Sequence, residues 1–434
     1  MPNSPSSSMP ISPQPEVKRT AMDRIKPWHI AATGMVSLAV AMGIGRFAFT
    51  PLLPMMLADG VITLPGASWL ASMNYLGYLV GALLCMLQPA IRRRLGRNAM
   101  PNGPMWVGGG LIGTVILTLG MAFYVPAVWP ILRFAAGVAS AVVFVYTSGW
   151  CLAVLARLNR PTMGALIYIG PGAGITLSGL AASGMVALHG SAWGGWLMFG
   201  VLAAALNGMI WPTLRAGAGS HQAARAIPSA PAPYVPVGTR KEMGLLTFAY
   251  GLAGFGYIIT ATFLPVIARQ ALPGSPWLDL FWPLFGVGVM AGAIVASRIH
   301  GVRDLRWLLM ACYLMQALGI ATSLISPSLA GFASGSFLLG LPFTAITYFA
   351  MQELRRLRPA HAASYMGMAT AFYGAGQISG PPLVAALLAR SPSPGAGFNL
   401  SLEIASSALV LGAVVYAWLV WRYPVNCSVQ SPQK

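Results

Sequence analysis

The chain has 434 residues, of which 56% are hydrophobic and only 8% are charged, and its mean hydropathy is +0.69. So few charges cannot cover a chain of this length with a water-compatible surface, which excludes a soluble globular enzyme and predicts a polytopic membrane protein. The formal net charge of +18 does not indicate a nucleic-acid partner, because the Lys and Arg residues stand in short segments between apolar stretches, as membrane topology requires.

A Ser- and Pro-rich tail, residues 1–27, precedes the first apolar stretch and ends in basic residues. Its composition predicts a disordered cytoplasmic segment. Twelve apolar stretches then follow, each of the roughly 20 residues that a helix needs to cross a bilayer. They cover residues 29–57, 68–89, 104–124, 126–155, 162–188, 192–214, 243–268, 277–299, 305–326, 329–352, 362–388 and 400–422. The first is too long for a signal peptide and lacks a cleavage pattern, so it is predicted to remain as a transmembrane helix.

The distribution of Lys and Arg orients these helices. With the N-terminus in the cytoplasm, all but four of the 26 Lys and Arg residues fall on the cytoplasmic side. Arg269 and Arg390 lie outside, and Arg46 and Arg133 lie within the membrane. The asymmetry satisfies the positive-inside rule and predicts cytoplasmic N- and C-termini. The preference for Arg over Lys, with many Ala, Gly and Pro residues, suggests a bacterial source, and we expect the protein in a bacterial inner membrane.

A repeated segment divides the chain into two halves. Residues 43–54 read GIGRFAFTPLLP and residues 254–265 read GFGYIITATFLP, so that Gly-x-Gly is followed by Leu-Pro at the same spacing with an offset of 211 residues. The same offset carries the glycines of the second stretch onto those of the eighth, Gly77 onto Gly288 and Gly81 onto Gly292. Arg46 is not repeated, because Tyr257 takes its place. The pattern indicates a duplication in which one half alone carries an interior arginine.

The repeat sets the predicted domain boundaries. We expect an N-terminal six-helix bundle at 28–214, a cytoplasmic linker at 215–242, a C-terminal six-helix bundle at 243–423 and a cytoplasmic tail at 424–434. The predicted fold is an all-α polytopic membrane protein with 12 transmembrane helices in two pseudo-symmetric six-helix bundles. This is the architecture of major facilitator transporters, which bind substrate near the middle of the membrane between the halves.

Several motifs resemble a known family. Residues 43–54 and the following segment 68–82, SWLASMNYLGYLVGA, are similar to the YbfB/YjiJ branch of the major facilitator superfamily (MFS). Residues 133–137 resemble the Arg-x-x-x-Gly signature of the fourth span, and residues 170–174 resemble the Gly-Pro signature common in exporters. Residues 92–97 resemble the Asp-Arg-x-Gly-Arg loop after the second span, without its aspartate. The resemblance implies the MFS fold and secondary transport.

Two arginines, Arg46 and Arg133, fall inside apolar stretches, where insertion costs roughly 2.5–3.5 kcal/mol each. All eight Asp and Glu residues lie in tails, in loops or near the ends of the stretches. The interior thus has two positive charges and no evident protein anion, and an unpaired buried charge is costly. A bound anion would complete the site, and a carboxylate suits the guanidinium fork. Arg133 could instead be a packing residue satisfied by backbone carbonyls, and both alternatives stay open.

Other polar and aromatic residues stand at positions compatible with a central cavity. The predicted substrate site comprises Arg46, Arg133, Asn74, Tyr78, Tyr257, Tyr373 and Gln377. Asn74 and Tyr78 are four residues apart and share one helix face. Each of these side chains alone also fits an interhelical hydrogen bond. No catalytic residue, cofactor or metal site is predicted, because the chain has no Walker phosphate loop and its five histidines lack paired metal spacing.

These observations predict a secondary active transporter, not an enzyme, that moves a small organic molecule by alternating access. The substrate is expected to be an anion such as a carboxylate, and the other partners are the lipid bilayer and a coupling proton or counter-anion. An alternative is a proton-coupled multidrug or metabolite exporter, although interior positive charge disfavours cationic drugs. A membrane sensor or integral membrane enzyme is a third alternative, and it would need a soluble domain or a nucleophile with its base.

Overall fold

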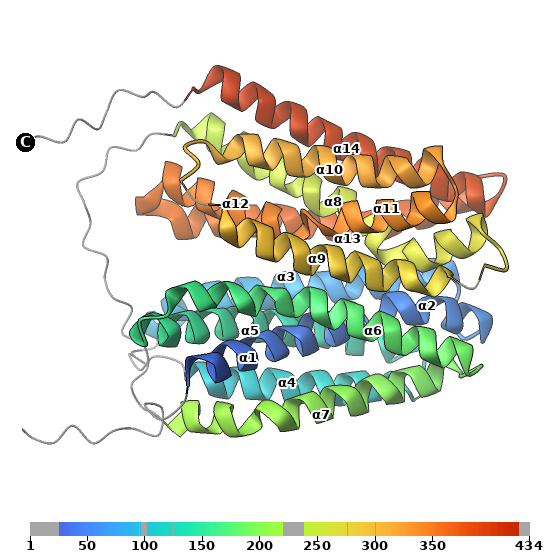
Figure 1. Cartoon of the computed structure of the whole chain (residues 1–434), viewed down its shortest axis with the longest axis horizontal. Helices are drawn as coiled ribbons and strands as arrows, with labels where there is room; N and C mark the ends of the chain where they lie inside the picture. Colours follow the sequence, from blue (N-terminus) through green and yellow to red (C-terminus); the bar gives the residue numbers. More distant parts are fainter. Residues whose placement is uncertain are drawn as a thin grey trace, which may run out of the picture.

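The structure, a computed structural model, describes residues 26–94, 96, 102–123, 125–219, 238–275, 277–299 and 301–424. Almost all of the predicted tails and most of the predicted linker lie outside these ranges. The regular structure of the described residues is entirely helical. Long helices run along a common direction in two groups, with α1 to α7 in one and α8 to α14 in the other (Figure 1).

The first group contains six spanning segments, of which the first and the fifth change helix type along their length. Its elements are α1 (Pro27–Leu38), the π-helix η2 (Ala39–Arg46), α2 (Phe49–Ala58), α3 (Leu64–Arg94), α4 (Gly103–Gly120), α5 (Trp129–Arg157), the 3₁₀-helix η3 (Pro161–Ile169), α6 (Gly170–Ala187) and α7 (Ala192–Gly219). α7 thus continues for five residues into the segment predicted as linker.

The second group repeats this plan. Its elements are α8 (Arg240–Ala271), η4 (Leu278–Leu280), α9 (Phe281–Arg298), α10 (Leu305–Ile325), α11 (Leu329–Gly340), α12 (Phe343–Leu357), η5 (Pro359–His361), α13 (Ala362–Arg390) and α14 (Pro394–Arg422). The predicted stretch 329–352 is divided between α11 and α12, since Pro342 stands at the break.

Eleven helical segments of the described residues are long and apolar enough to cross a membrane. The twelve predicted stretches include one, 362–388, that is not among these eleven. It forms α13, a helix of 29 residues whose mean hydropathy is lowered by its glycines, Gln377 and the pair Pro381 and Pro382. The first and seventh spans are the most enclosed by protein, because 94% and 89% of the residues in their apolar 18-residue segments are buried. The predicted fold class of two six-helix bundles is therefore confirmed, with Arg46 on a central helix.

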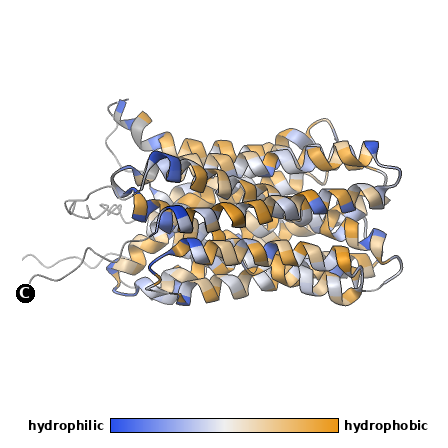
Figure 2. Ribbon diagram, turned by 90° about the horizontal axis from the view of Figure 1, so that it is seen from above, coloured by the Kyte–Doolittle hydropathy of each residue, from blue (hydrophilic) through white to orange (hydrophobic). Residues whose placement is uncertain are grey.

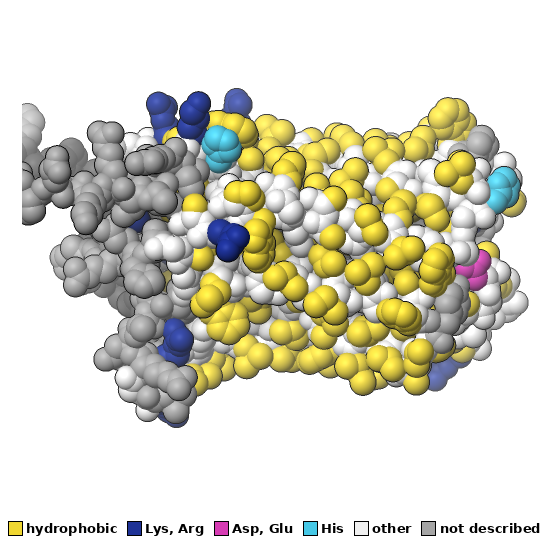
Figure 3. Space-filling model, turned by 90° about the horizontal axis from the view of Figure 1, so that it is seen from below, with side chains coloured by type: hydrophobic (Ala, Val, Ile, Leu, Met, Phe, Trp, Pro, Cys, Tyr) yellow, Lys and Arg dark blue, Asp and Glu magenta, His cyan; other side chains and the backbone are white. Residues whose placement is uncertain are grey.

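The surface follows the same plan. Hydrophilic residues concentrate toward the two ends of the bundle, and hydrophobic residues follow its length (Figure 2). On the face in Figure 3, most Lys and Arg side chains lie near the end where α1 begins and α14 finishes, and hydrophobic side chains cover the middle. We call this basic end the inner end and the opposite one the outer end.

The repeated glycines make equivalent contacts in both halves. A Cβ added at Gly43 would lie 2.3 Å from Gly174 in α6, and one added at Gly254 would lie 2.3 Å from the carbonyl oxygen of Tyr373 in α13. The central helix of each half is thus held against the fifth helix of that half, because only glycine permits so close an approach. The duplication read from the sequence is therefore a duplication of helix packing.

The two halves meet at equivalent positions. The hydroxyl of Thr50 donates to the carbonyl oxygen of Ala261 at 3.1 Å, and these residues are 211 positions apart, the offset of the repeat. A contact between equivalent positions is expected where two repeats face each other across their pseudo-two-fold axis. This axis therefore passes close to the outer part of the first and seventh spans.

Gly77 provides a test of this packing. A Cβ at Gly77 would lie 1.9 Å from the carbonyl oxygen of Phe134, so Gly77→Ala must push α3 away from α5. We expect a loss of about 1–3 kcal/mol of stability, seen as a lower melting temperature and folded yield in detergent. Gly109→Ala is the matched control, because nothing lies within 4 Å of its added Cβ. Equal melting temperatures for the two variants would contradict the packing.

Candidate functional site

The first span changes from α to π geometry just before it reaches the candidate site. The amide of Phe47 donates to Met42 five residues back at 3.0 Å, whereas the amide of Thr50 turns to Phe47 at 3.1 Å. The next residue, Pro51, has no N–H to donate. The carbonyl of Arg46 is therefore left without a partner in its own helix, a kind of local irregularity that is common at functional sites.

Arg133 of α5 donates hydrogen bonds to this free carbonyl and to that of the neighbouring Gly45. Its Nη2 donates to the carbonyl oxygen of Arg46 at 3.0 Å, and its Nη1 donates to that of Gly45 at 3.4 Å. Its guanidinium also faces the ring of Phe49 at 5.0 Å, and the residue is only 2% exposed. In this structure Arg133 therefore makes the backbone contacts that the packing alternative requires, and it fixes the segment that carries Arg46.

Arg46 reaches across to the other half of the molecule. Its Nη2 donates to Oε1 of Gln377 in α13 at 2.8 Å, and Nε2 of Gln377 donates in turn to the hydroxyl of Tyr257 in α8. The guanidinium carbon of Arg46 lies 4.0 Å from the centre of the Tyr78 ring. Arg46 is 3% exposed, and its Nε has no partner among the described residues. A buried positive charge is thus held at the interface by neutral groups.

The remaining predicted residues join the same group. Nδ2 of Asn74 donates to the carbonyl oxygen of Arg133 at 2.9 Å, and Asn74 is fully buried with its Oδ1 unpartnered in the described part of the chain. The rings of Tyr257 and Tyr373 are stacked with centroids 5.9 Å apart. All seven predicted site residues therefore lie in one connected network, although Asn74 touches the backbone of Arg133 and not its guanidinium.

The carboxylates of the described residues lie away from both interior arginines. At the outer end, Asp59 accepts from a backbone N–H of α7, Asp279 pairs with Arg269, and Glu403 is exposed. The other three lie at the inner end. No salt bridge within the described ranges involves Arg46 or Arg133. The electrostatic pattern expected from the sequence, interior positive charge without a nearby protein anion, is thus present around Arg46.

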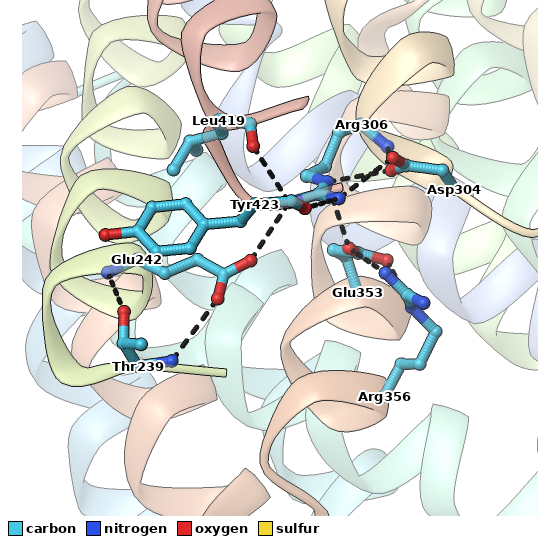
Figure 4. Close-up of polar contacts among 8 residues, drawn as sticks. All are labelled: Thr239, Glu242, Asp304, Arg306, Glu353, Arg356, Leu419 and Tyr423. Carbon is cyan, nitrogen blue, oxygen red and sulfur yellow. Dashed lines mark hydrogen bonds and ion pairs between the residues drawn. The ribbon is translucent and has the colours of Figure 1, made fainter. Parts of the chain in front are cut away.

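The three inner carboxylates form a buried cluster that sequence reasoning missed (Figure 4). Arg306, 1% exposed, donates to Glu242 at 2.9 Å and makes a two-pronged contact with Asp304 at 2.8 and 2.9 Å. Glu353, 0% exposed, lies 3.7 Å from Arg306 and pairs with Arg356 at 2.6 Å. Arg306 also donates to the backbone carbonyls of Leu419 in α14 and of Tyr423 just after it. The cluster therefore ties together the inner ends of α8, α10, α12 and α14.

Hydrogen bonds from side chains close the outer part of the interface between the halves. We call this set of six the outer closure. Its pairs are Arg46 with Gln377, Thr50 with Ala261, Ser72 with Ile378, Tyr75 with Thr262, Thr176 with Pro283 and Ser183 with Asp279. All six lie between the middle of the spans and the outer end. In this structure the two halves are therefore joined by hydrogen bonds in the part of the bundle toward its outer end.

Two parallel six-helix halves that meet around a buried, polar mid-membrane network define a membrane transporter of the major facilitator type. A family model described as "Uncharacterised MFS-type transporter YbfB" matches residues 38–417. The chain belongs to this family, which confirms the resemblance seen in its first two spans.

The fold also has a solved counterpart. The chain is similar to the crystal structure of the nucleoside transporter NupG, determined for a single-residue mutant, with a TM-score of 0.66 and 14% sequence identity. The alignment covers 91% of this chain and 99% of NupG. At this identity the likeness shows the fold alone. No curated protein matches the chain.

The backbone contacts of Arg133 lead to a stability prediction. Arg133→Met leaves the carbonyls of Gly45 and Arg46 unsatisfied, and each buried unsatisfied group costs about 1–3 kcal/mol. We expect the melting temperature to fall by several degrees in detergent. Arg390→Met, at an exposed site in the last turn of α13, is the matched control and should leave the melting temperature nearly unchanged. An unaltered melting temperature for Arg133→Met would contradict the conclusion that Arg133 fixes the segment that carries Arg46.

Proposed function

We propose that this protein is a secondary active transporter that carries a small organic anion, such as a carboxylate, across the membrane by alternating access. The observation that carries the proposal is Arg46. Its guanidinium is 3% exposed and is held between the halves by the neutral amide of Gln377 and the ring of Tyr78. Family membership supports the transport activity, and the uncompensated charge supports the substrate class.

A carboxylate matches the electrostatics of the site. An arginine in a low-dielectric interior is stabilised most by an ionised acceptor, and charge-assisted hydrogen bonds are roughly twice as strong as neutral ones. Arg133, whose Nη2 lies 3.0 Å from the carbonyl oxygen of Arg46, adds a second positive charge nearby. A nucleoside, the ligand class that names NupG, has no negative charge to offer. The site therefore favours an anion over a neutral ligand.

The other network residues have distinct proposed roles. Arg46 is the direct contact for the anionic group, and Tyr78, Tyr257, Tyr373 and Gln377 surround it on the interface between the halves. Asn74 and Arg133 contribute to the same site mainly by holding its backbone. In the transport cycle the halves would rock about this network, and the outer closure would have to open for exchange with the outside.

The proposed location and coupling follow from the charges. The basic inner end would face the cytoplasm of a bacterium, with both termini on that side. Five of the six described carboxylates lie at the two ends of the bundle, and the sixth, Glu403, is exposed in the outer third of α14. His29, His189 and His361 lie at or near helix ends. Coupling would therefore use a proton carried with the substrate, or exchange of one anion for another.

A thermal-shift screen of the purified protein tests this proposal. The panel should contain organic acids, amino acids, nucleosides and cationic drugs, because a ligand that binds the folded state raises its melting temperature. We expect at least one carboxylate to stabilise the wild type and the Arg390→Gln control, but not Arg46→Gln. Stabilisation by only neutral or cationic ligands, equal in all three proteins, would contradict an anion site at Arg46.

A further inference from the structure

We infer that Gln377 is an internal competitor of the substrate: its amide oxygen takes the position on Arg46 that a substrate carboxylate oxygen would take. The two contacts are then mutually exclusive, so Gln377 selects for anions and ties their binding to the opening of the outer closure. This inference rests on the proposed function of Arg46 as the anion contact.

The geometry holds the Gln377 amide at both of its ends. Oε1 accepts from Nη2 of Arg46 at 2.8 Å, and Nε2 donates to the hydroxyl of Tyr257. Gln377 and Tyr257 are each 1% exposed. At the residue directly before Gln377, a Cβ added to Gly376 would lie 2.4 Å from the carbonyl oxygen of Gly251, so the backbones of α13 and α8 are in close contact there. The amide oxygen is therefore presented to the other half from a fixed backbone.

The contact also discriminates between ligands. A neutral ligand that displaced Gln377 would replace one neutral oxygen acceptor on Arg46 with another and would gain little. A carboxylate would replace a neutral acceptor with a charged one, and it could bond both to Nη2 and to the unpartnered Nε. Specificity arises here from a competing contact that only the correct class of ligand overcomes.

Displacement of Gln377 from Arg46 by a ligand also affects the interface between the two halves. Arg46 belongs to η2 of the first half and Gln377 to α13 of the second. In the outer closure, theirs is the one bond that a charged side chain makes, because Asp279 takes part only through its backbone carbonyl. A ligand that displaces Gln377 removes this link. Because a ligand shifts an equilibrium only through its different affinity for the two states, this displacement is a direct route from anion binding to outer opening.

Two variants of Gln377 test the inference with a reporter that needs no ligand. In a background where Cys85, Cys151, Cys312 and Cys427 are replaced by Ser, Ala261→Cys places a thiol at a position that is 1% exposed in the outer closure. A membrane-impermeant maleimide added from outside then measures outer opening. We expect Gln377→Leu to raise the labelling rate about tenfold, because it removes a hydrogen bond to a charged group.

Gln377→Glu should act in the opposite direction, because it gives Arg46 a permanent internal anion. We expect its labelling rate to fall below that of the wild type. Gln316→Leu is the matched control: Gln316 is also 1% exposed, but it donates to Leu339 within its own half, so labelling should not change. Equal labelling rates in the wild type, Gln377→Leu and Gln377→Glu would overturn the inference.

The binding arm uses acetate, benzoate and succinate as probes, with affinity measured in detergent. We expect Gln377→Leu to bind the best of them more tightly than the wild type, and Gln377→Glu to bind it at least about tenfold more weakly. Weaker binding in Gln377→Leu would make Gln377 a ligand and overturn the competition. If none of them binds the wild type and the thermal-shift screen yields no other carboxylate, the proposed function itself fails, and the competition fails with it.

Discussion

Arg46→Gln is expected to abolish transport of the anionic substrate while the protein still inserts and folds. The substitution removes the positive charge and the two N–H donors that would hold a carboxylate, each worth about 1.5–3 kcal/mol. The combined loss corresponds to roughly 10²- to 10⁴-fold weaker binding. Uptake of the ligand found by thermal shift, measured in proteoliposomes, checks this result. Arg46→Lys keeps the charge but loses the fork, so it should retain only part of the activity.

The controls separate binding from folding. Arg390→Gln changes an exposed arginine of the same α13 helix that carries Gln377, and it should transport normally. The elution profile and melting temperature of Arg46→Gln should remain those of a folded protein. Full transport by a folded Arg46→Gln would remove Arg46 from the proposed site.

The second large effect is expected at the buried cluster of the inner end. Glu353→Leu removes a carboxylate that is 0% exposed and that lies 3.7 Å from Arg306 and 2.6 Å from Arg356. Breaking a buried ion pair by removing one partner costs about 3–5 kcal/mol, and the lower end applies here because Arg306 keeps Glu242 and Asp304 and the Arg356 side chain is 33% exposed. We therefore expect a much lower melting temperature and a poor folded yield in detergent.

A double variant distinguishes lost charge pairing from lost packing. Glu353→Leu combined with Arg356→Leu removes both charges of one pair and should recover part of the stability that Glu353→Leu loses, since coupled residues are not additive. Glu403→Leu, at an exposed position of α14, is the single-residue control. If Glu353→Leu and Glu403→Leu had the same small effect, the cluster would not stabilise the fold.

The helical plan could be predicted from sequence because its determinants are local or repeated. Apolar stretches of spanning length fix the helices, and the glycines at 43, 77, 254 and 288 reappear because both halves need the same close helix contacts. This steric requirement can be seen in the sequence, because only glycine meets it. The type of helix cannot be predicted in the same way. A uniformly apolar stretch has no periodicity that would distinguish the π-helix at Ala39–Arg46 from an α-helix.

The site was only partly readable from sequence. Arg46, Gln377 and Tyr257 were all expected in the interior, but their mutual hydrogen bonds depend on which helix faces meet across the halves. The contacts of Arg133 with backbone carbonyls depend on the π-helix, so the sequence alone allows both a packing role and a ligand role for Arg133. The pairing of Arg306 with Glu242 was missed, although three acids and several arginines at the inner ends of one half were a usable signal.

Equilibrium binding measured by titration calorimetry is the most direct test that Arg46 binds the anionic group of the substrate. The titrant is the carboxylate that stabilises the wild type in the thermal-shift screen. We predict one site per chain in the wild type and at least about hundredfold weaker binding in Arg46→Gln, as expected for the loss of about 3 kcal/mol or more. Equal affinities in the two folded proteins would contradict the account.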